Sequence, residues 1–270
     1  MAGDTLALAG RMAGAYAAFV RAHLLRILEY RASFAIGSLA ILTRHAATLL
    51  TLWVIFGRAR ALAGWSVDQV LFLYGTVSLI VAFHHLLFFN TYRLEFLIHE
   101  ATLDRYLLRP LPTLFQLLLY HFDDDALGDF VPAIAILAYA AARLGIELSA
   151  WTCTVFAAGI AGGVLVHFGI HLVLCSWSFW FVKSRALIQL FAELRPLSHY
   201  PLGAYGTPVR AVLCTAIPLA FAGFFPAEYL ARPGTVSGMA LLALPVGLAC
   251  FALGLVAWSA GLARYSSAGS

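Results

Sequence analysis

Long apolar stretches separated by short polar connections dominate the sequence. A helix of about 20 apolar residues is long enough to cross the hydrocarbon core of a bilayer, at 1.5 Å of rise per residue. Charged residues are few within the stretches and collect at their ends. The pattern predicts five membrane-spanning helices, at about residues 33–56, 70–89, 130–144, 151–182 and 236–262.

A sixth span is expected before the last one, where the pattern is less regular. Residues 186–206 contain Glu193 and Arg195, and residues 207–225 are apolar but short and interrupted by Pro218. One span followed by a re-entrant hairpin fits this region, because irregular backbone at membrane depth must be covered by protein. The expected fold is an all-α integral membrane protein with six transmembrane helices and an extracellular re-entrant hairpin before the last helix.

The N-terminal residues 11–31 have the three-four spacing of an amphipathic helix. Arg21, Arg26 and Glu29 lie on the polar side of that helix. Such a helix can rest in the membrane interface with its apolar face in lipid. Periodicity alone leaves open whether it is a simple anchor or presents its polar face to a partner protein.

A second polar segment, residues 90–128, connects the second and third spans. It contains three arginines and six of the thirteen acidic residues. Leucines and aromatic residues alternate with the charges, which favours contact with another protein over contact with solvent, and Pro110 and Pro112 end the short helix. The candidate contact residues are Glu100, Leu103, Asp104, Arg105, Tyr106 and Arg109.

The composition requires lipid as a solvent. Hydrophobic residues make up 62% of the chain and charged residues 11%, whereas soluble domains carry about 25% charged residues. The net charge is only +4 and basic residues form no runs, so nucleic-acid binding is not indicated. The four cysteines lie in apolar stretches without metal-ligand spacing and are interpreted as small buried hydrophobic residues.

The distribution of basic residues predicts the orientation. With six spans and the N-terminus inside, ten basic residues fall in cytoplasmic segments and five in outer ones, so both termini are expected in the cytoplasm of a cell-membrane protein. The inner set is Arg11, Arg21, Arg26, Arg31, Arg93, Arg105, Arg109, Lys183, Arg185 and Arg264, and the outer set is Arg58, Arg60, Arg143, Arg210 and Arg232.

The sequence contains no nucleotide-binding motif. A P-loop needs a lysine after a glycine-rich turn, and the only lysine, Lys183, follows Val182. If ATP drives this protein, another chain must bind it, so no enzyme activity and no cofactor are expected here.

Two other function classes stay open on the residues alone. An ion-coupled secondary transporter usually carries acids within its spans, and Glu193 is the strongest candidate for that role. An intramembrane metalloenzyme could use His167 and His171, which share one helical face, although hydrogen bonding between helices is the simpler interpretation. Residues 123–125, all aspartates, are interpreted as a solvated helix start rather than as a metal site.

Arg44 and Arg195 fall within predicted spans and are left out of the count above, and Arg44 lies near the middle of the first span. A lone arginine at the centre of a bilayer costs about 2.5–3.5 kcal/mol on insertion scales. Arg44 lies about 16 Å inside the proposed helix start, too deep for its side chain to reach the interface alone unless the span begins nearer Leu39. We therefore expect an acidic partner, and Glu193 is the best available one, unless a second subunit supplies it.

Two stretches resemble a known family. They read HEATLDRYLLRPLPTLFQLLLYHF after the second span and HYPLGAYGTPVRAVLCTAIPLAFAGFFPAEYL before the last. Both resemble permease subunits of type-2 ABC exporters, in the branch long called uncharacterised ABC transport permeases, and the six-span pattern extends the resemblance over residues 1–270. Where that branch often has glycine, this chain has Ala101-Thr102. The matching residues are Leu103, Asp104, Tyr106, Leu107, Arg109, Pro110, Tyr200, Pro201, Arg210, Ile217, Pro218, Ala220, Phe221, Pro226 and Ala227.

The resemblance implies a division of labour. Two permease subunits, commonly two different but related chains, form the pathway, and two separate ATPase subunits bind and hydrolyse ATP. Residues 90–128 are similar to the coupling segment that rests on the ATPase, and residues 11–31 are similar to the connecting helix beside it. Residues 207–225 are similar to the re-entrant helices that close the pathway outside, with the gate residues Tyr200, Pro201, Arg210, Pro218 and Phe221.

Overall fold

The computed structural model describes most of the chain. It covers residues 31–119, 124–147, 149–181, 184–234 and 238–266, together with Gly14, Arg21, Leu25 and Glu29. Helices make up its regular structure, and an isolated β-bridge between Leu62 and Trp65 is the only extended pairing within these residues. The amphipathic helix predicted at 11–31, including Arg26, lies largely outside the described residues.

Five helices in the described ranges are long and apolar enough to cross a membrane. They confirm that the chain is a helical membrane protein and agree with the five regular spans predicted from hydropathy. The helices that form them are α2 (Arg31–Arg58), α3 (Val67–Phe88), α7 (Asp124–Leu144), α8 (Ala150–Ser176) and α12 (Ala243–Leu262).

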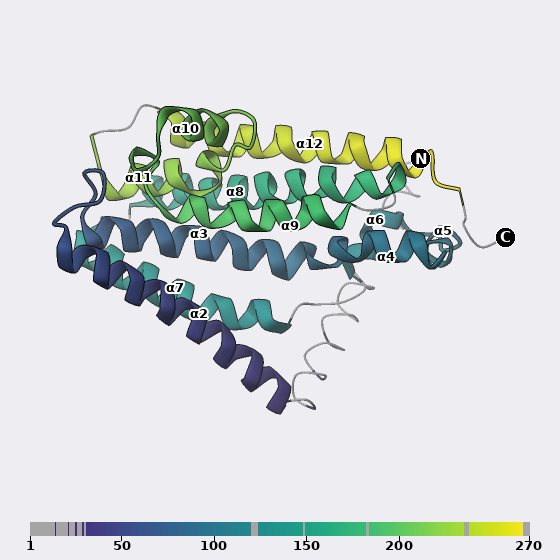
Figure 1. The fold of residues 1–270 in the computed structure, drawn as a ribbon, viewed down its shortest axis with the longest axis horizontal. Helices are drawn as coiled ribbons and strands as arrows, with labels where there is room; N and C mark the ends of the chain where they lie inside the picture. Colours follow the sequence, from purple (N-terminus) through teal and green to yellow (C-terminus); the bar gives the residue numbers. More distant parts are fainter. Residues whose placement is uncertain are drawn as a thin grey trace.

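The sixth predicted span falls on a shorter helix. Helix α9 (Arg185–Leu194) continues into a 3₁₀ helix at Arg195–His199, and together they are shorter than the five long helices. In Figure 1, α9 runs beside α3 and α8. The six-span topology therefore stays a prediction.

Helices α3, α8 and α12 run along one axis of the molecule, α2 and α7 lie at an angle to it, and the connections gather at its two ends (Figure 1). One end carries the turn between α2 and α3, together with α10 (Thr207–Cys214) and α11 (Phe225–Ala231). The other end carries the polar segment, whose helices are α4 (Leu94–His99), α5 (Asp104–Leu107) and α6 (Thr113–Leu119).

Local sequence signals place the start of α3. Leu62 and Trp65 exchange two backbone hydrogen bonds of 3.0 and 2.9 Å around Ala63 and Gly64, which both have positive φ. This is the geometry of a two-residue hairpin turn. Ser66 then caps α3, because its side chain accepts from the Gln69 backbone N–H while the Gln69 side chain accepts from the Ser66 N–H.

The region predicted to be re-entrant turns back on itself. After α10, the chain turns at Pro218 and returns through a π-helix at Ala220–Phe224 into α11. The turn lines a cavity with residues from the middle of α8 and α12, among them Gly169 and Cys250. Phe224 meanwhile packs on Trp65 of the α2–α3 turn, with ring centroids 5.3 Å apart. The region thus reaches into the bundle from that end, whereas its placement in a bilayer stays a prediction.

Helices α8 and α12 approach each other through glycines. A Cβ atom on Gly162 would overlap the backbone of Ala243, and one on Gly169 would overlap the backbone of Cys250. On the α12 side, a Cβ on Gly247 would overlap the carbonyl oxygen of Gly162. Small residues at such contacts let two membrane helices touch backbone to backbone, where dispersion contacts are densest.

Candidate functional site

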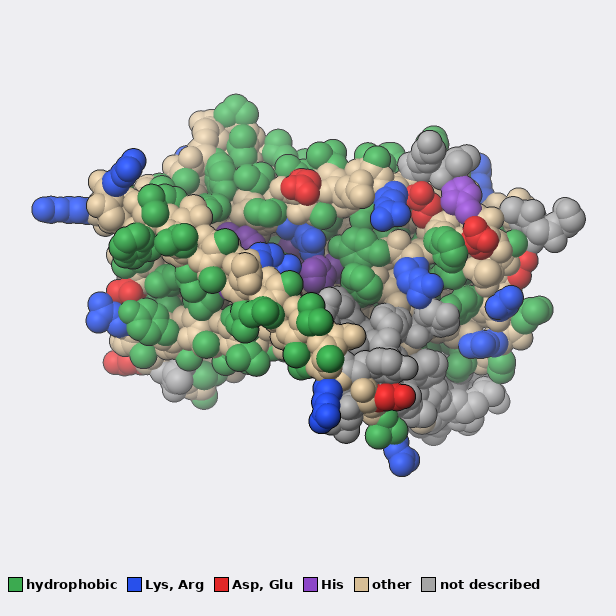
Figure 2. All heavy atoms as spheres, turned by 60° about the horizontal axis from the view of Figure 1, so that its bottom comes forward, with side chains coloured by type: hydrophobic (Ala, Val, Ile, Leu, Met, Phe, Trp, Pro, Cys, Tyr) green, Lys and Arg blue, Asp and Glu red, His purple; other side chains and the backbone are tan. Residues whose placement is uncertain are grey.

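A polar cavity lies between α2, α3, α7 and the α9 region. Its volume is about 300 Å³, at the lower end of the roughly 300–1,000 Å³ typical of small-molecule sites. Figure 2 shows arginine and histidine side chains gathered in a hollow of a surface that is otherwise mostly apolar. The polar lining consists of Arg44, His45, Thr48, Tyr74, Ser78, His85, Asp129, Arg195, His199 and Tyr200.

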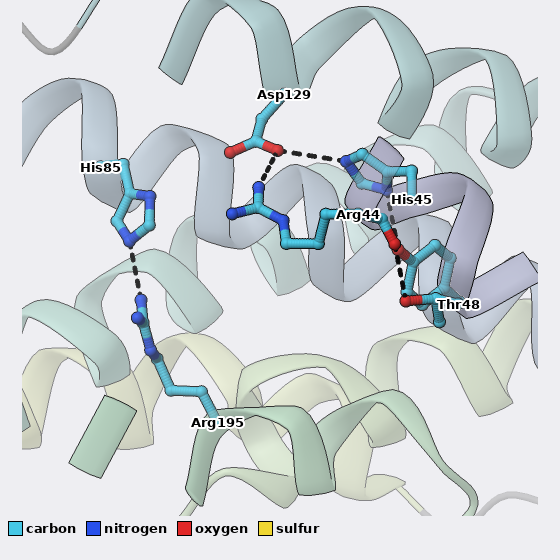
Figure 3. Close-up of polar contacts among 7 residues, drawn as sticks. Arg44, His45, Thr48, His85, Asp129 and Arg195 are labelled. Carbon is cyan, nitrogen blue, oxygen red and sulfur yellow. Dashed lines mark hydrogen bonds and ion pairs between the residues drawn. The ribbon is translucent and has the colours of Figure 1, made fainter. Parts of the chain in front are cut away.

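Arg44 reaches this cavity from the middle of α2. It stands about 20 Å from either end of the helix at 1.5 Å per residue. Its Nη2 donates to Asp129 Oδ1 of α7 at 2.5 Å (Figure 3). The Arg44 side chain is 60% exposed, whereas that of Asp129 is 7% exposed. The pair therefore places a buried carboxylate beneath an arginine that remains open to the cavity.

Asp129 also organises a second group. His45 Nε2 lies 3.1 Å from the same Asp129 Oδ1, and His45 Nδ1 lies 2.7 Å from the Tyr74 hydroxyl. If Nε2 carries the proton and donates to the carboxylate, Nδ1 accepts from the tyrosine. The chain of contacts links three helices, α2, α3 and α7, through one carboxylate.

The expected pairing of Arg44 with Glu193 is wrong in this structure. Glu193 is exposed on α9, and Asp129 takes the arginine instead. Sequence reasoning passed over Asp129 because it directly precedes the apolar stretch predicted for the third span. Helix α7 begins at Asp124, five residues earlier, which carries Asp129 into the bundle.

Arg195 faces the cavity from the opposite wall. Its Nη1 donates to His85 Nε2 at 2.7 Å (Figure 3). Its Nε is buried and has no hydrogen-bond partner among the described residues. None of the ion pairs found in the described part of the chain involves Arg195. Its guanidinium therefore contacts His85, a neutral acceptor, and no carboxylate among these residues.

The predicted gate residues do not gather at one place. Tyr200 lines the polar cavity, and Pro201 beside it is buried. Pro218 lines the separate apolar cavity between α8, α9 and α12, and Phe221 is buried in the π-helix. Arg210 is exposed on α10. Their role as a gate stays a prediction.

The candidate coupling residues divide into two sets. Leu103 and Tyr106 are buried in a core cluster with Leu94 and Trp258, so they support the segment rather than form its surface. Asp104 is half-buried, and its Oδ1 accepts a 2.9 Å hydrogen bond from the Tyr265 hydroxyl beyond α12. Exposed side chains at this end include Phe96, Glu100, Arg105, Leu107, Leu108 and Arg109, and we call these six the coupling surface.

Leu108 is the most prominent member that sequence reasoning missed. It is 86% exposed, although it is apolar and lies between charged residues. Gln116 of α6 holds the loop beside it, because its amide nitrogen donates to the carbonyls of Tyr106 and Leu111 at 2.8 and 2.7 Å. A fixed apolar tip among charges is typical of a protein-contact surface.

Glu95 joins this end of the molecule to α9. Its Oε2 accepts hydrogen bonds from the Ser184 backbone N–H, the Ser184 hydroxyl and the Arg185 backbone N–H, at 2.9, 2.9 and 2.6 Å. A carboxylate at the first N–H groups of a helix satisfies donors that have no partner within the helix. These bonds tie α4 to the start of α9, which leads into Arg195.

His167 and His171 lie in a buried cluster with His84. The rings of His84 and His167 are 5.8 Å apart, and those of His84 and His171 are 5.4 Å apart. Their ring nitrogens have no hydrogen-bond partner within the described residues, so the expected hydrogen bonds between helices are not seen there. No group of metal-binding side chains in a suitable arrangement occurs in the ranges that the structure describes.

Comparison with known proteins identifies the family. A family model described as "ABC-2 family transporter protein" matches residues 42–269, which is most of the chain. No curated protein and no solved structure matches it. The match agrees with the resemblance carried by the motifs at residues 103–110 and 200–227.

Proposed function

We propose that this chain, which belongs to the ABC-2 family of transporter proteins, is the permease subunit of an ATP-driven exporter. In this proposal it forms the substrate pathway with a second permease subunit, which is a related but different chain. Two separate ATPase subunits supply the energy. Membership of the family and the long apolar helices establish an ABC permease in a membrane; the export direction and the subunits are the proposal.

The observation that carries the proposal is the coupling surface with its connection to the bundle. Leu108 and the charges around it project from the end of the molecule, on a loop held by Gln116. Behind that surface, Glu95 binds the start of α9, and α9 carries Arg195 to the polar cavity. A partner that moves the coupling surface therefore moves one wall of the cavity relative to α2 and α7.

The coupling end is proposed to face the cytoplasm. The basic residues predicted inside outnumber those predicted outside by ten to five. Two exposed positions at opposite ends test this orientation: Arg60 in the α2–α3 connection and Ser266 beyond α12. In a variant without the four native cysteines, a membrane-impermeant thiol reagent added to intact cells should label R60C and spare S266C. Labelling of S266C alone contradicts the orientation.

Charge reversal at the two ends tests the coupling role. R109E alters the coupling surface, and R60E makes the same change at the other end of the molecule, where the side chain is also exposed. Reversing a charge in a contact costs several kcal/mol when it meets a like charge. We expect R109E to lose co-purification of ATP-hydrolysing subunits and R60E to keep it, with equal amounts of both variants in the membrane. Equal co-purification contradicts the assignment.

Apolar contact at the same surface is tested separately. L108E places a charge where a partner is expected to bury an apolar side chain, and L108M keeps that side chain apolar. We expect the rate of ATP hydrolysis in the purified complex to depend on the permease. Only L108E should make that rate independent of the permease. ATP hydrolysis by the permease chain itself, after contaminating ATPases are removed, contradicts the division of labour.

A further inference from the structure

The charges around the polar cavity do not balance. Arg44 and Asp129 neutralise each other at 2.5 Å, and the remaining charged residue in the lining is Arg195. The histidines that complete the lining add no negative charge. The cavity thus holds one arginine in excess beside the middle of α2, and an unpaired arginine at the centre of a membrane-spanning helix costs about 2.5–3.5 kcal/mol.

The hydrogen bonds of Arg195 show the same imbalance. A guanidinium has five N–H donors, and one of them is taken by His85 Nε2. The Nε–H has no partner in the described residues although it is shielded from solvent. Arg195 lines the cavity, and the N–H donors on Nη1 and Nη2 that His85 does not take can bind the oxygens of a carboxylate or phosphate in pairs.

The walls favour a ligand with an apolar part. Val81, Ala192 and Pro196 line the cavity between the polar groups, and the surrounding face is mostly apolar (Figure 2). The cavity follows α3 from Tyr74 to His85, about 16 Å at 1.5 Å per residue. An anionic headgroup can bind Arg195 while the attached chain lies along the apolar walls.

We propose that this cavity binds the anionic headgroup, a phosphate or carboxylate, of an amphiphilic molecule, with Arg195 as its main ligand. Arg44 is the second cation within the cavity, held in place by Asp129. The inference deepens the proposed permease function by giving the chemical class of the cargo. The identification of the ligand as transported cargo rests on the proposed permease function. The binding itself does not, because it is measured on the purified chain without an ATPase.

Thermal stabilisation of the full-length chain in a non-ionic maltoside detergent tests the inference. The probes are dodecyl phosphate, inorganic phosphate and dodecyltrimethylammonium, at matched concentrations and pH 8. A ligand that binds only the folded state raises the unfolding temperature in a concentration-dependent manner. We expect a rise with dodecyl phosphate and none with the cation. A rise of equal size with inorganic phosphate identifies a free anion, rather than a lipid-like headgroup, as the source of the phosphate.

Variants assign the binding to Arg195. R195Q should weaken dodecyl phosphate binding by about tenfold or more, as expected for loss of a charge-assisted hydrogen bond, whereas R195K should retain part of it. R210Q removes an exposed arginine outside the cavity and should change nothing. Binding that is equal in R195Q and the unaltered chain overturns the proposal.

A second variant keeps the test valid if R195Q does not fold. Ala192 lines the cavity three residues before Arg195, so a glutamate there can pair with Arg195 within the same protein. A192E should abolish stabilisation by dodecyl phosphate, and A192Q should not. Undiminished stabilisation of A192E also overturns the proposal. If dodecyl phosphate does not bind, the experiments on the coupling surface can still succeed. If those experiments fail, the binding of dodecyl phosphate to the purified chain can still be measured.

Discussion

Two helix pairs in this molecule are held together in different ways. Helices α8 and α12 meet at Gly162, Gly169 and Gly247, where no side chain separates the backbones. Helices α2 and α7 meet at Arg44, His45 and Asp129, through hydrogen bonds into a cavity. In Figure 1, α8 and α12 run side by side, whereas the N-terminal part of α2 diverges from the bundle.

These two kinds of helix contact differ in how easily they can rearrange. Backbone contact leaves no room for rearrangement, because any separation loses many dispersion contacts at once. A hydrogen-bonded contact beside a cavity can exchange one partner for another, such as a ligand. We infer that α8 and α12 form the frame and that α2 and α9 form the walls that change during transport.

The largest expected effect comes from adding a methyl group to the frame. In G169A the new Cβ overlaps the carbonyl of Cys250, which is backbone and cannot yield by changing a rotamer. We expect the free energy of unfolding to fall by about 3 kcal/mol, the upper end for overpacked cores. Chemical unfolding in mixed micelles measures this.

A matched control exists on α2. Gly57 has nothing within 4 Å of its ideal Cβ, so G57A should be neutral or slightly stabilising through its higher helix propensity. Equal losses in G169A and G57A contradict the assignment of α8 and α12 as the frame.

Breaking the polar contact should cost less. R44Q leaves the buried Asp129 with His45 as its remaining partner, and we expect a loss of about 2 kcal/mol. The value is below that for a fully buried pair, because Arg44 is 60% exposed and screening reduces its contribution.

A double-mutant cycle tests the pair directly. The variant R44Q/D129N should be more stable than the sum of the two single losses predicts, by about 1–2 kcal/mol, because the two charges are removed together. The cycle R44Q with E193Q serves as the control, and its losses should be additive. Additive losses for Arg44 and Asp129 would show that the pair does not form.

A substitution outside the two helix pairs is expected to stabilise the protein, and its effect on the free energy of unfolding can be compared with the losses above. Ala101 has φ 51°, a left-handed conformation that costs a residue with Cβ about 1–2 kcal/mol. We expect A101G to raise the free energy of unfolding by up to about 1 kcal/mol, and A101V to lower it.

The smallest effect is expected from adding a methyl group to the adjustable pair. In G128A the new Cβ lies 3.0 Å from Ile41 Cδ1 and 3.3 Å from Ser38 Oγ, both ends of side chains that can move. The stability should stay within about 1 kcal/mol of the original, because helix propensity offsets the crowding. A loss as large as that of G169A would remove the distinction between the two helix pairs.

Much of the candidate site could be located from sequence, although its contacts could not. Arg44 stood out because hydropathy makes an arginine within a span costly, and it lies near the middle of α2. The segment around Asp104 stood out because charges and leucines alternate there, and the structure gives that segment an exposed end. The burial of Leu103 and Tyr106 was not evident, because an apolar residue in a short amphipathic helix can face either its own protein or a partner.

The sequence by itself determined the helical membrane class, the five long helices and the polar segment, because each depends on the local solvent preference of about 20 neighbouring residues. Only the tertiary structure decided that Arg44 pairs with Asp129, 85 residues away, and that Glu95 binds the start of α9, 89 residues away. Helices such as α3 and α8 are apolar on nearly all sides. Hydropathy therefore does not fix how each helix is rotated about its axis, and the packing of the whole bundle sets which polar groups meet.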